Sequence, residues 1–540
     1  MPDPATEGLF IKLALLIVFF AVMVGIGLYC RRHATDVSGF VLGGRSVGPW
    51  LTAFAYGTSY FSAVVFVGYA GQFGWRFGIA ATWAGLGNAF LGSLLAWVVL
   101  GRRTRIMTQH LDSATMPEFF GRRFDSRRLK LAASAITFLF LIPYTASLYN
   151  GLSRLFGMAF DIDYSVCVIV MAVLTGVYVI AGGYMATAIN DFIQGIIMIF
   201  GIIAVVAAVL NSQGGFQAAL DAMGRVTDPA VSDTPGVFAS FFGPDLTGLA
   251  GVVVLTSLGT WGLPQMVQKF YAIKSEDAIT QGTVISTIFA LIVAGGCYFL
   301  GGFGRLFGDR VDVAAEGYDA IIPAMLSGLP AILIAIVVIL VLSASMSTLS
   351  SLVLASSSTL VLDFLKDGVI KHMDEKRQLR WMRALVVVFI AISVVLAIVQ
   401  YRVGLSFIAQ LMGVSWGALA GSFLAPFLYG LYWKRTTKAA CGACFAFSTV
   451  VMLANIFVGE HFPALIQSPI NCGAFCMLAG LVIVPVVSLI TPGQDRRRVA
   501  EIFSCYARTV TVSVTDSIGP RHALEEAEGR EKPVDFTDKT

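Results

Sequence analysis

Long apolar runs dominate this sequence, and they decide its fold class. One of them, AILIAIVVILVLSASM at residues 331–346, contains no charged side chain. About 20 apolar residues in a helix cross the roughly 30 Å hydrocarbon core of a bilayer. Only 13% of the 540 residues are charged, whereas soluble domains contain about a quarter. The sequence therefore predicts an all-α integral membrane protein.

We predict about 13 membrane-spanning segments. They are expected near residues 9–29, 48–70, 75–100, 130–156, 163–183, 191–210, 246–265, 279–303, 329–361, 382–400, 405–432, 439–458 and 470–491. With this count, 30 of the 37 Lys and Arg residues fall on one side, including those of segment 269–274. Because Lys and Arg accumulate in cytoplasmic loops, the N-terminus is predicted outside and the C-terminus in the cytoplasm, as in a multi-pass inner (plasma) membrane protein. The first run is predicted to be a retained span, since its Arg pair follows it.

Two of the predicted spans carry helix breakers at comparable places. AYGTSYFS (55–62) and SLGTWGLP (257–264) each contain Gly-Thr in mid-span, and the second adds Pro264. Unwound backbone at membrane depth is tolerated only where it is buried in protein or lines a cavity, and paired interruptions indicate a central binding site between two repeats. The predicted organisation is a leading span with its link, a five-span unit, an external loop, an inverted five-span unit, two trailing spans and a cytoplasmic tail. The boundaries are 1–47, 48–210, 211–245, 246–432, 433–492 and 493–540.

The segment LSASMSTLSSLVLASSS (342–358) places nine hydroxyl groups inside an apolar helix. Ala344, Ser347, Thr348 and Ser351 fall at i, i+3, i+4 and i+7, so they share one face; Ser343, Ser347 and Ser350 form an overlapping stripe. Hydroxyl and carbonyl oxygens can replace the hydration shell of a cation, and an unwound backbone around 58–61 could complete the shell. The alternative is ordinary: Ser and Thr in membrane helices often bond back to their own helix or join two helices.

Other chemistry finds little support in the sequence. The five His lie outside the predicted spans, and the eight Cys show no second CxxC pair at metal-ligand spacing. No span contains a nucleophile–base pair, so we expect neither an enzyme, nor an organic cofactor, nor a metal other than an alkali ion. The net charge of +4 gives no indication of a nucleic-acid partner, and no obligate protein partner is evident. Asp191, at the head of the sixth span, is a functional candidate or a helix cap.

Several segments of this sequence are similar to those of a known family. They are LGGRSVGPWLTAFAYGTSYFS (42–62), MPEFFGRRF (116–124), PYTAS (143–147), IAGGYMATAINDFIQG (180–195) and ASMSTLSS (344–351). In their order and spacing they resemble the sodium:solute symporter family, most closely the bacterial sodium/proline symporters. The resemblance implies a LeuT-type fold of two inverted five-helix repeats with one leading and two trailing helices. It also implies Na⁺-driven uptake of a small organic solute by alternating access.

The resemblance also assigns site residues. A sodium site would use backbone oxygens of Thr58, Phe61 and Ala344 with the hydroxyls of Ser347 and Thr348. A possible second sodium site would use Ser350, Ser351 and Asp191. The residues expected beside the solute are Tyr60, Ser62, Gly68, Tyr144, Thr260, Trp261 and Pro264.

The solute is expected to be an amino acid such as proline, with a small monocarboxylate or other organic acid as the alternative. Tyr60, Val64 and Thr260 depart from the residues that the proline carriers have at these positions, beside the expected pocket. No Arg or Lys falls inside a predicted span near the pocket, so a carboxylate would need helix ends or Na⁺ as its counter-charge. Two rival functions for such a fold are a sensor that signals to a separate partner and a passive channel.

Overall fold

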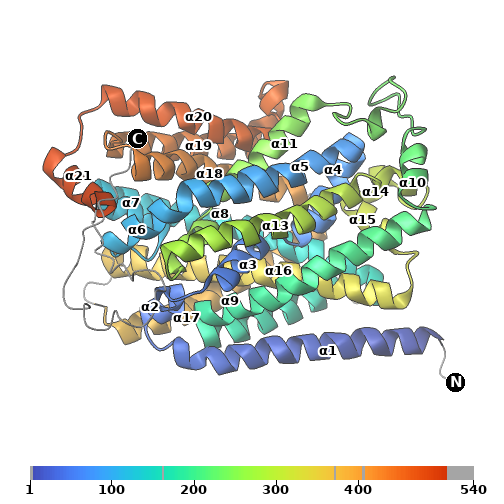
Figure 1. Ribbon diagram of the computed structural model, residues 1–540, viewed down its shortest axis with the longest axis horizontal. Coiled ribbons are helices and arrows are strands. Elements are labelled where there is room, and N and C mark those ends of the chain that lie inside the picture. Colours follow the sequence, from blue (N-terminus) through green and yellow to red (C-terminus); the bar gives the residue numbers. More distant parts are fainter. Residues whose placement is uncertain (1–3, 161–162, 370–372, 404–407, 508–540) are drawn as a thin grey trace, which may run out of the picture.

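Helices joined by loops make up the part of the chain that the computed structural model describes, residues 4–160, 163–369, 373–403 and 408–507 (Figure 1). The helices are α1 (Pro4–Cys30), α2 (Val37–Leu42), α3 (Pro49–Tyr60), α4 (Ala70–Phe77), α5 (Thr82–Gly87), α6 (Arg102–His110), α7 (Met116–Phe124), α8 (Arg127–Phe160), α9 (Tyr164–Ser212), α10 (Phe216–Met223), α11 (Leu246–Leu258), α12 (Pro264–Ala272), α13 (Glu276–Gly301), α14 (Val313–Glu316), α15 (Ile321–Leu326), α16 (Ala331–Thr359), α17 (Glu375–Val403), α18 (Ile408–Tyr432), α19 (Lys438–Val458), α20 (Pro469–Ile490) and α21 (Arg496–Phe503). The tail that the sequence predicts from residue 493 is described only as far as residue 507, and the rest of it lies outside the described residues.

Eleven helical stretches of the described residues are long and apolar enough to cross a membrane. Two of them, Val64–His110 and Tyr164–Ser212, are 47 and 49 residues long, more than twice what one crossing needs. Each contains a glycine with positive φ that interrupts it: Gly78 (φ 63°) and Gly183 (φ 54°). Dividing each stretch at its glycine, and joining α3 to the first part of Val64–His110, gives the 13 predicted segments.

The two interruptions predicted from Gly-Thr are present in the backbone. Helix α3 ends at Tyr60, Phe61 is extended (φ −86°, ψ 118°), and the chain resumes as a π-helix, Val64–Tyr69. Helix α11 ends at Leu258, a short 3-10 turn follows, Leu263 is extended (φ −82°, ψ 121°), and α12 begins with Pro264. Proline suits this position because the first N–H groups of a helix have no partner within it.

Helix α16 lies in the interior of the bundle, where it packs against α8, α9, α3 and α12. From Leu340 to Thr359 every residue of α16 is buried, so its hydroxyl groups face protein on all sides. Helix α1 runs along one edge of the molecule, and α19 and α20 run along the opposite edge (Figure 1). The fold thus brings the hydroxyl-rich helix alongside both interrupted helices.

Candidate functional site

Five oxygen atoms of α3 and α16 converge where α3 is interrupted. The hydroxyl of Thr348 lies 3.0 Å from the carbonyl oxygen of Thr58, 3.2 Å from that of Phe61 and 3.1 Å from that of Ala344. The hydroxyl of Ser347 lies 3.1 Å from the Thr58 oxygen and 3.0 Å from the Ala344 oxygen. These five residues, which we call the α3–α16 cradle, are the ones that the resemblance assigned to a sodium site. The structure brings all five together.

The interruption of α3 explains why its carbonyl groups are available. The last four carbonyls of a helix have no N–H partner within it, and the Thr58 and Phe61 oxygens receive hydroxyl groups of α16 instead. Both Ser347 and Thr348 also bond back to Ala344 on their own helix, as the ordinary alternative expected. The contacts across to α3 agree with the other part of that alternative, hydroxyl groups that join two helices. The observation that favours a cation site is that three carbonyl oxygens converge on one hydroxyl, that of Thr348. Because a hydroxyl can rotate its proton outward, the cradle can present its oxygens to a buried cation without any fixed negative charge.

Of the three residues considered for a second sodium site, Ser350 and Ser351 lie about one turn further along α16, and Asp191 lies on α9. The Ser350 hydroxyl donates to the Ser347 carbonyl on the same helix, at 2.9 Å. The Ser351 hydroxyl lies 2.9 Å from the Ser59 hydroxyl and accepts a hydrogen bond of 3.0 Å from the ammonium group of Lys269. The same ammonium is 3.9 Å from a carboxylate oxygen of Asp191. Ser351 and Asp191 therefore meet around Lys269.

The position of Lys269 corrects the sequence prediction, which counted it in a cytoplasmic segment and expected no Lys or Arg inside a span near the pocket. The candidate span extends from Leu246 to Ala272, and the side chain of Lys269 is only 3% exposed. The prediction ended this span near residue 265 because polar residues follow Pro264. In the structure α12 carries them inward, and every residue of α12 is buried.

Three residues predicted to contact the solute lie buried around the interruption of α3: Tyr60, Ser62 and Tyr144. The Tyr144 ring packs edge-on against Trp416 of α18, with the ring centroids 5.9 Å apart. The hydroxyls of Tyr60 and Tyr144 and the indole N–H of Trp416 are buried without a hydrogen-bond partner. Unpaired buried donors are unfavourable, so a polar ligand beside the packed rings of Tyr144 and Trp416 would satisfy the donors of these two side chains.

Sequence reasoning missed Trp416. It lies in GVSWGALAG (413–421) among small residues, and it packs against Gly259 of the second interruption, where a Cβ atom would come within 2.7 Å of the indole ring. A single large aromatic within a run of small residues is the signal that could have identified it. The ring joins α8, α18 and the segment between α11 and α12.

The other predicted solute residues are engaged with the protein itself. Thr260 donates its hydroxyl to the carbonyls of Gly92 and Ser257, both at 2.9 Å, and Trp261 donates its indole N–H to the Leu91 carbonyl at 2.9 Å. Their polar groups therefore fix the second interruption to the π-helix Asn88–Leu95. Pro264 begins α12.

Gly68, also predicted to contact the solute, lies in the π-helix Val64–Tyr69. A Cβ atom at this position would come within 3.0 Å of Ile408 and 3.6 Å of a carboxylate oxygen of Asp319. Gly68 therefore permits close packing at the start of α18.

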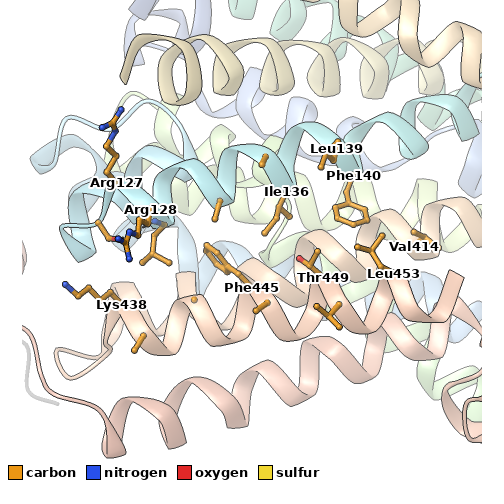
Figure 2. Close-up of a pocket in the computed structure, with 18 of the residues that line it drawn as sticks. Arg127, Arg128, Ile136, Leu139, Phe140, Val414, Lys438, Phe445, Thr449 and Leu453 are labelled. Carbon is orange, nitrogen blue, oxygen red and sulfur yellow. Dashed lines mark hydrogen bonds between the residues drawn. The ribbon is translucent and has the colours of Figure 1, made fainter. Parts of the chain in front are cut away.

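A groove of about 1200 Å³ lies elsewhere, between α8 and α19 (Figure 2). Apolar side chains such as Ile136, Phe140 and Leu453 line most of it, and Arg128 and Lys438 lie at one end (Figure 2). None of the predicted sodium or solute residues lines this groove. Its outward-facing residues, including Leu139 at 59% exposure, suit contact with lipid chains, so we do not assign the solute to it.

Comparisons with known proteins agree with this architecture. Residues 40–449 match the sodium:solute symporter family. The sodium/proline symporter of Staphylococcus aureus strain JH9 is 29% identical over 438 residues, which cover 79% of this chain and 82% of that protein; the protein of strain N315 gives the same values. A solved substrate-bound, outward-open structure of a Na⁺-coupled sialic acid symporter aligns with a TM-score of 0.71 at 16% identity, covering 90% of this chain and 98% of that one.

The structural likeness confirms the predicted all-helical LeuT-type fold, and the match over 410 of the 540 residues confirms the resemblance seen in the sequence. The chain belongs to the sodium:solute symporter family and is a multi-pass membrane transporter that couples solute movement to Na⁺.

Proposed function

We propose that one Na⁺ binds in the α3–α16 cradle and drives uptake of a small amino acid, with proline the leading candidate. The observation that carries this proposal is the convergence of the Thr348 hydroxyl on three carbonyl oxygens at 3.0–3.2 Å. A cation there would join the interrupted α3 to the intact α16. Its arrival would fix the end of α3, and with it Tyr60 and Ser62 beside the solute.

The energetics suit a scavenging carrier. One charge that crosses a potential of 100 mV releases about 2.3 kcal/mol, and each 1.4 kcal/mol corresponds to about tenfold. The voltage alone would therefore sustain roughly fifty-fold accumulation per ion. We place the N-terminus outside and the C-terminus in the cytoplasm of the inner membrane, on the strength of the Lys and Arg distribution, and we propose no organic cofactor.

The solute assignment rests on the unpaired donors of Tyr60, Tyr144 and Trp416. Hydroxyl and indole donors suit the carboxylate of an amino acid, and the aromatic rings of Tyr144 and Trp416 suit a compact apolar body such as a pyrrolidine ring. Sodium/proline symporters among the relatives support this choice. A small monocarboxylate is the second candidate, because Tyr60, Ser62, Tyr144 and Trp416 include no carboxylate to hold an amine.

Uptake into proteoliposomes tests both parts of the proposal. We expect saturable, Na⁺-dependent uptake of radiolabelled proline that K⁺ does not support, and competition by unlabelled monocarboxylates would identify the second candidate instead. Binding without uptake would indicate a sensor, and uptake that does not saturate would indicate a channel.

Thr348→Ala removes the hydroxyl that reaches three carbonyls, so we expect the Na⁺ concentration for half-maximal uptake to rise at least tenfold, which corresponds to about 1.4 kcal/mol. Thr348→Ser keeps the oxygen and should restore most of the affinity. Ser358→Ala is a matched control, because that hydroxyl donates to carbonyls of its own helix, at 2.7 Å and 3.2 Å. Equal Na⁺ dependence in Thr348→Ala and the control would refute the cradle.

A further inference from the structure

Beside the cradle, the ammonium group of Lys269 occupies a buried pocket formed with Asp191 and Ser351. Lys269 of α12, Asp191 of α9 and Ser351 of α16 come from three helices far apart in the sequence, and the side chains of Lys269 and Asp191 are 3% and 0% exposed. The ammonium donates to Ser351 at 3.0 Å, lies 3.9 Å from Asp191 and stands 5.1 Å from the centroid of the Tyr184 ring. A carboxylate, a hydroxyl and an aromatic face thus surround one positive charge.

This arrangement bears on how many ions the transporter binds. A carboxylate and a serine hydroxyl are ligands that suit Na⁺, and they are also what the Lys269 ammonium contacts. Buried charges of the same sign repel strongly because little water screens them, so a Na⁺ placed next to Asp191 would compete with the ammonium. The carboxylate can neutralise one of the two cations.

We propose that the Lys269 ammonium holds the cation position of the Asp191–Ser351 pocket permanently, so that this transporter binds one Na⁺, in the cradle, rather than two. The proposal rests on the proposed function for the cradle and replaces the second sodium site with a residue of the chain. It also gives Lys269 a positioning role. Lys269 lies on α12, just after the second interruption, and its partner Ser351 contacts Ser59 near the end of α3, at the first interruption.

The hydrogen bonds show how the two regions are joined. Lys269 donates to the Ser351 hydroxyl, which lies 2.9 Å from the hydroxyl of Ser59, and Ser59 is the neighbour of Thr58, whose carbonyl belongs to the cradle. A fixed charge at Lys269 therefore holds α12 against the end of α3 whether or not Na⁺ is present. An exchangeable ion at the same place would release this contact each time it left.

Counting bound ions tests the proposal without knowledge of the solute. Equilibrium dialysis of the purified full chain with ²²Na⁺ should give one ion per chain, and Na⁺ titration of tryptophan fluorescence should give a Hill slope of 1. Lys269→Gln removes the charge while keeping a polar side chain, and should bind a second Na⁺ with a slope that moves toward 2. Lys269→Arg should keep one ion, and so should Lys269→Gln combined with Asp191→Asn.

Two results would overturn the proposal: two ions bound to the wild-type chain, or a single ion bound to Lys269→Gln. If Lys269→Gln does not fold, the wild-type count still decides, since only a count of one agrees with a permanently occupied pocket. Thr348→Ala separates this inference from the proposed function. Loss of the wild-type ion in that variant supports the cradle whatever the count, and retention of one ion refutes the cradle while leaving the pocket to be judged by Lys269→Gln.

Discussion

The α3–α16 cradle and the Lys269 pocket lie about one turn apart on α16, yet they are made of different groups. The cradle contains three carbonyl and two hydroxyl oxygens, all neutral. The pocket contains an ammonium group and a carboxylate, whose side chains are 3% and 0% exposed. A Na⁺ in the proposed cradle site would have no fixed counter-charge and could leave, whereas the Lys269 ammonium is covalently part of the chain and cannot exchange.

The difference also separates the roles of the two interrupted helices. Helix α3 contributes backbone carbonyls that its early end leaves unpaired, and α12 contributes a side chain that its start at Pro264 carries into the protein. We infer that the α3 carbonyls belong to the site where Na⁺ exchanges, and that the Lys269 side chain of α12 is a permanent contact between helices.

Asp191→Asn should be the most damaging single change. It leaves Lys269 buried without its carboxylate, and breaking a buried pair in this way destabilises proteins by roughly 3–5 kcal/mol. We expect a marked fall in the unfolding temperature, measured by tryptophan fluorescence in detergent, and a large recovery when Lys269→Gln is added. Equal stability of Asp191→Asn and the wild type would show that the Asp191–Lys269 ion pair does not stabilise the contact between α9 and α12.

A second buried carboxylate, Asp319, offers a comparison outside the membrane-spanning segments. Burial raises its pKa from 3.8 to about 7, and the backbone N–H of Ile408, at 3.5 Å, and the charge of Arg154 oppose the shift only in part. Because the folded pKa lies above the unfolded one, this group favours folding least at high pH. The wild type should lose on the order of 2 kcal/mol of stability between pH 5 and pH 8.

Asp319→Asn should flatten that loss, as measured by chemical unfolding at the two pH values. Parallel pH profiles for the wild type and Asp319→Asn would contradict the assignment.

Sequence patterns predicted the cradle because its features are local. A spacing of three and four residues places Ser347 and Thr348 on one face, and Gly-Thr and Pro264 mark the interruptions. The contacts of both regions join residues far apart in the sequence, but only the two sides of the cradle each carry a local signal. The Lys269 pocket could not be found in this way, because the predicted span ended near residue 265 and so excluded Lys269. Trp416 was missed for a similar reason, since its partners Tyr144 and Gly259 meet it only in the folded bundle.

Ser347→Ala and Ser350→Ala form a pair that separates the two faces of α16. The Ser347 hydroxyl reaches Thr58 of α3 at 3.1 Å, whereas the Ser350 hydroxyl bonds the backbone of its own helix. We expect Ser347→Ala to weaken Na⁺ binding about tenfold, or about 1.4 kcal/mol, and Ser350→Ala to change it little. Equal effects of the two changes on ²²Na⁺ affinity would place Ser350 in an ion site as well.

The smallest effect is expected at Ser59, where the two regions meet. Its hydroxyl lies between Ser351 and the Ala55 carbonyl, so Ser59→Ala removes a side-chain hydrogen bond and should cost about 1 kcal/mol of stability. If the pocket only braces α3, the variant should keep one bound Na⁺ and lose at most severalfold in affinity, because the Thr58 carbonyl remains but its position is held less firmly. Thr52→Ala is a suitable control, since its hydroxyl donates to the Gly48 carbonyl of the preceding turn, at 2.9 Å. A change in the number of bound ions in Ser59→Ala would mean that the two regions form a single ion site, and the contrast between them would fail.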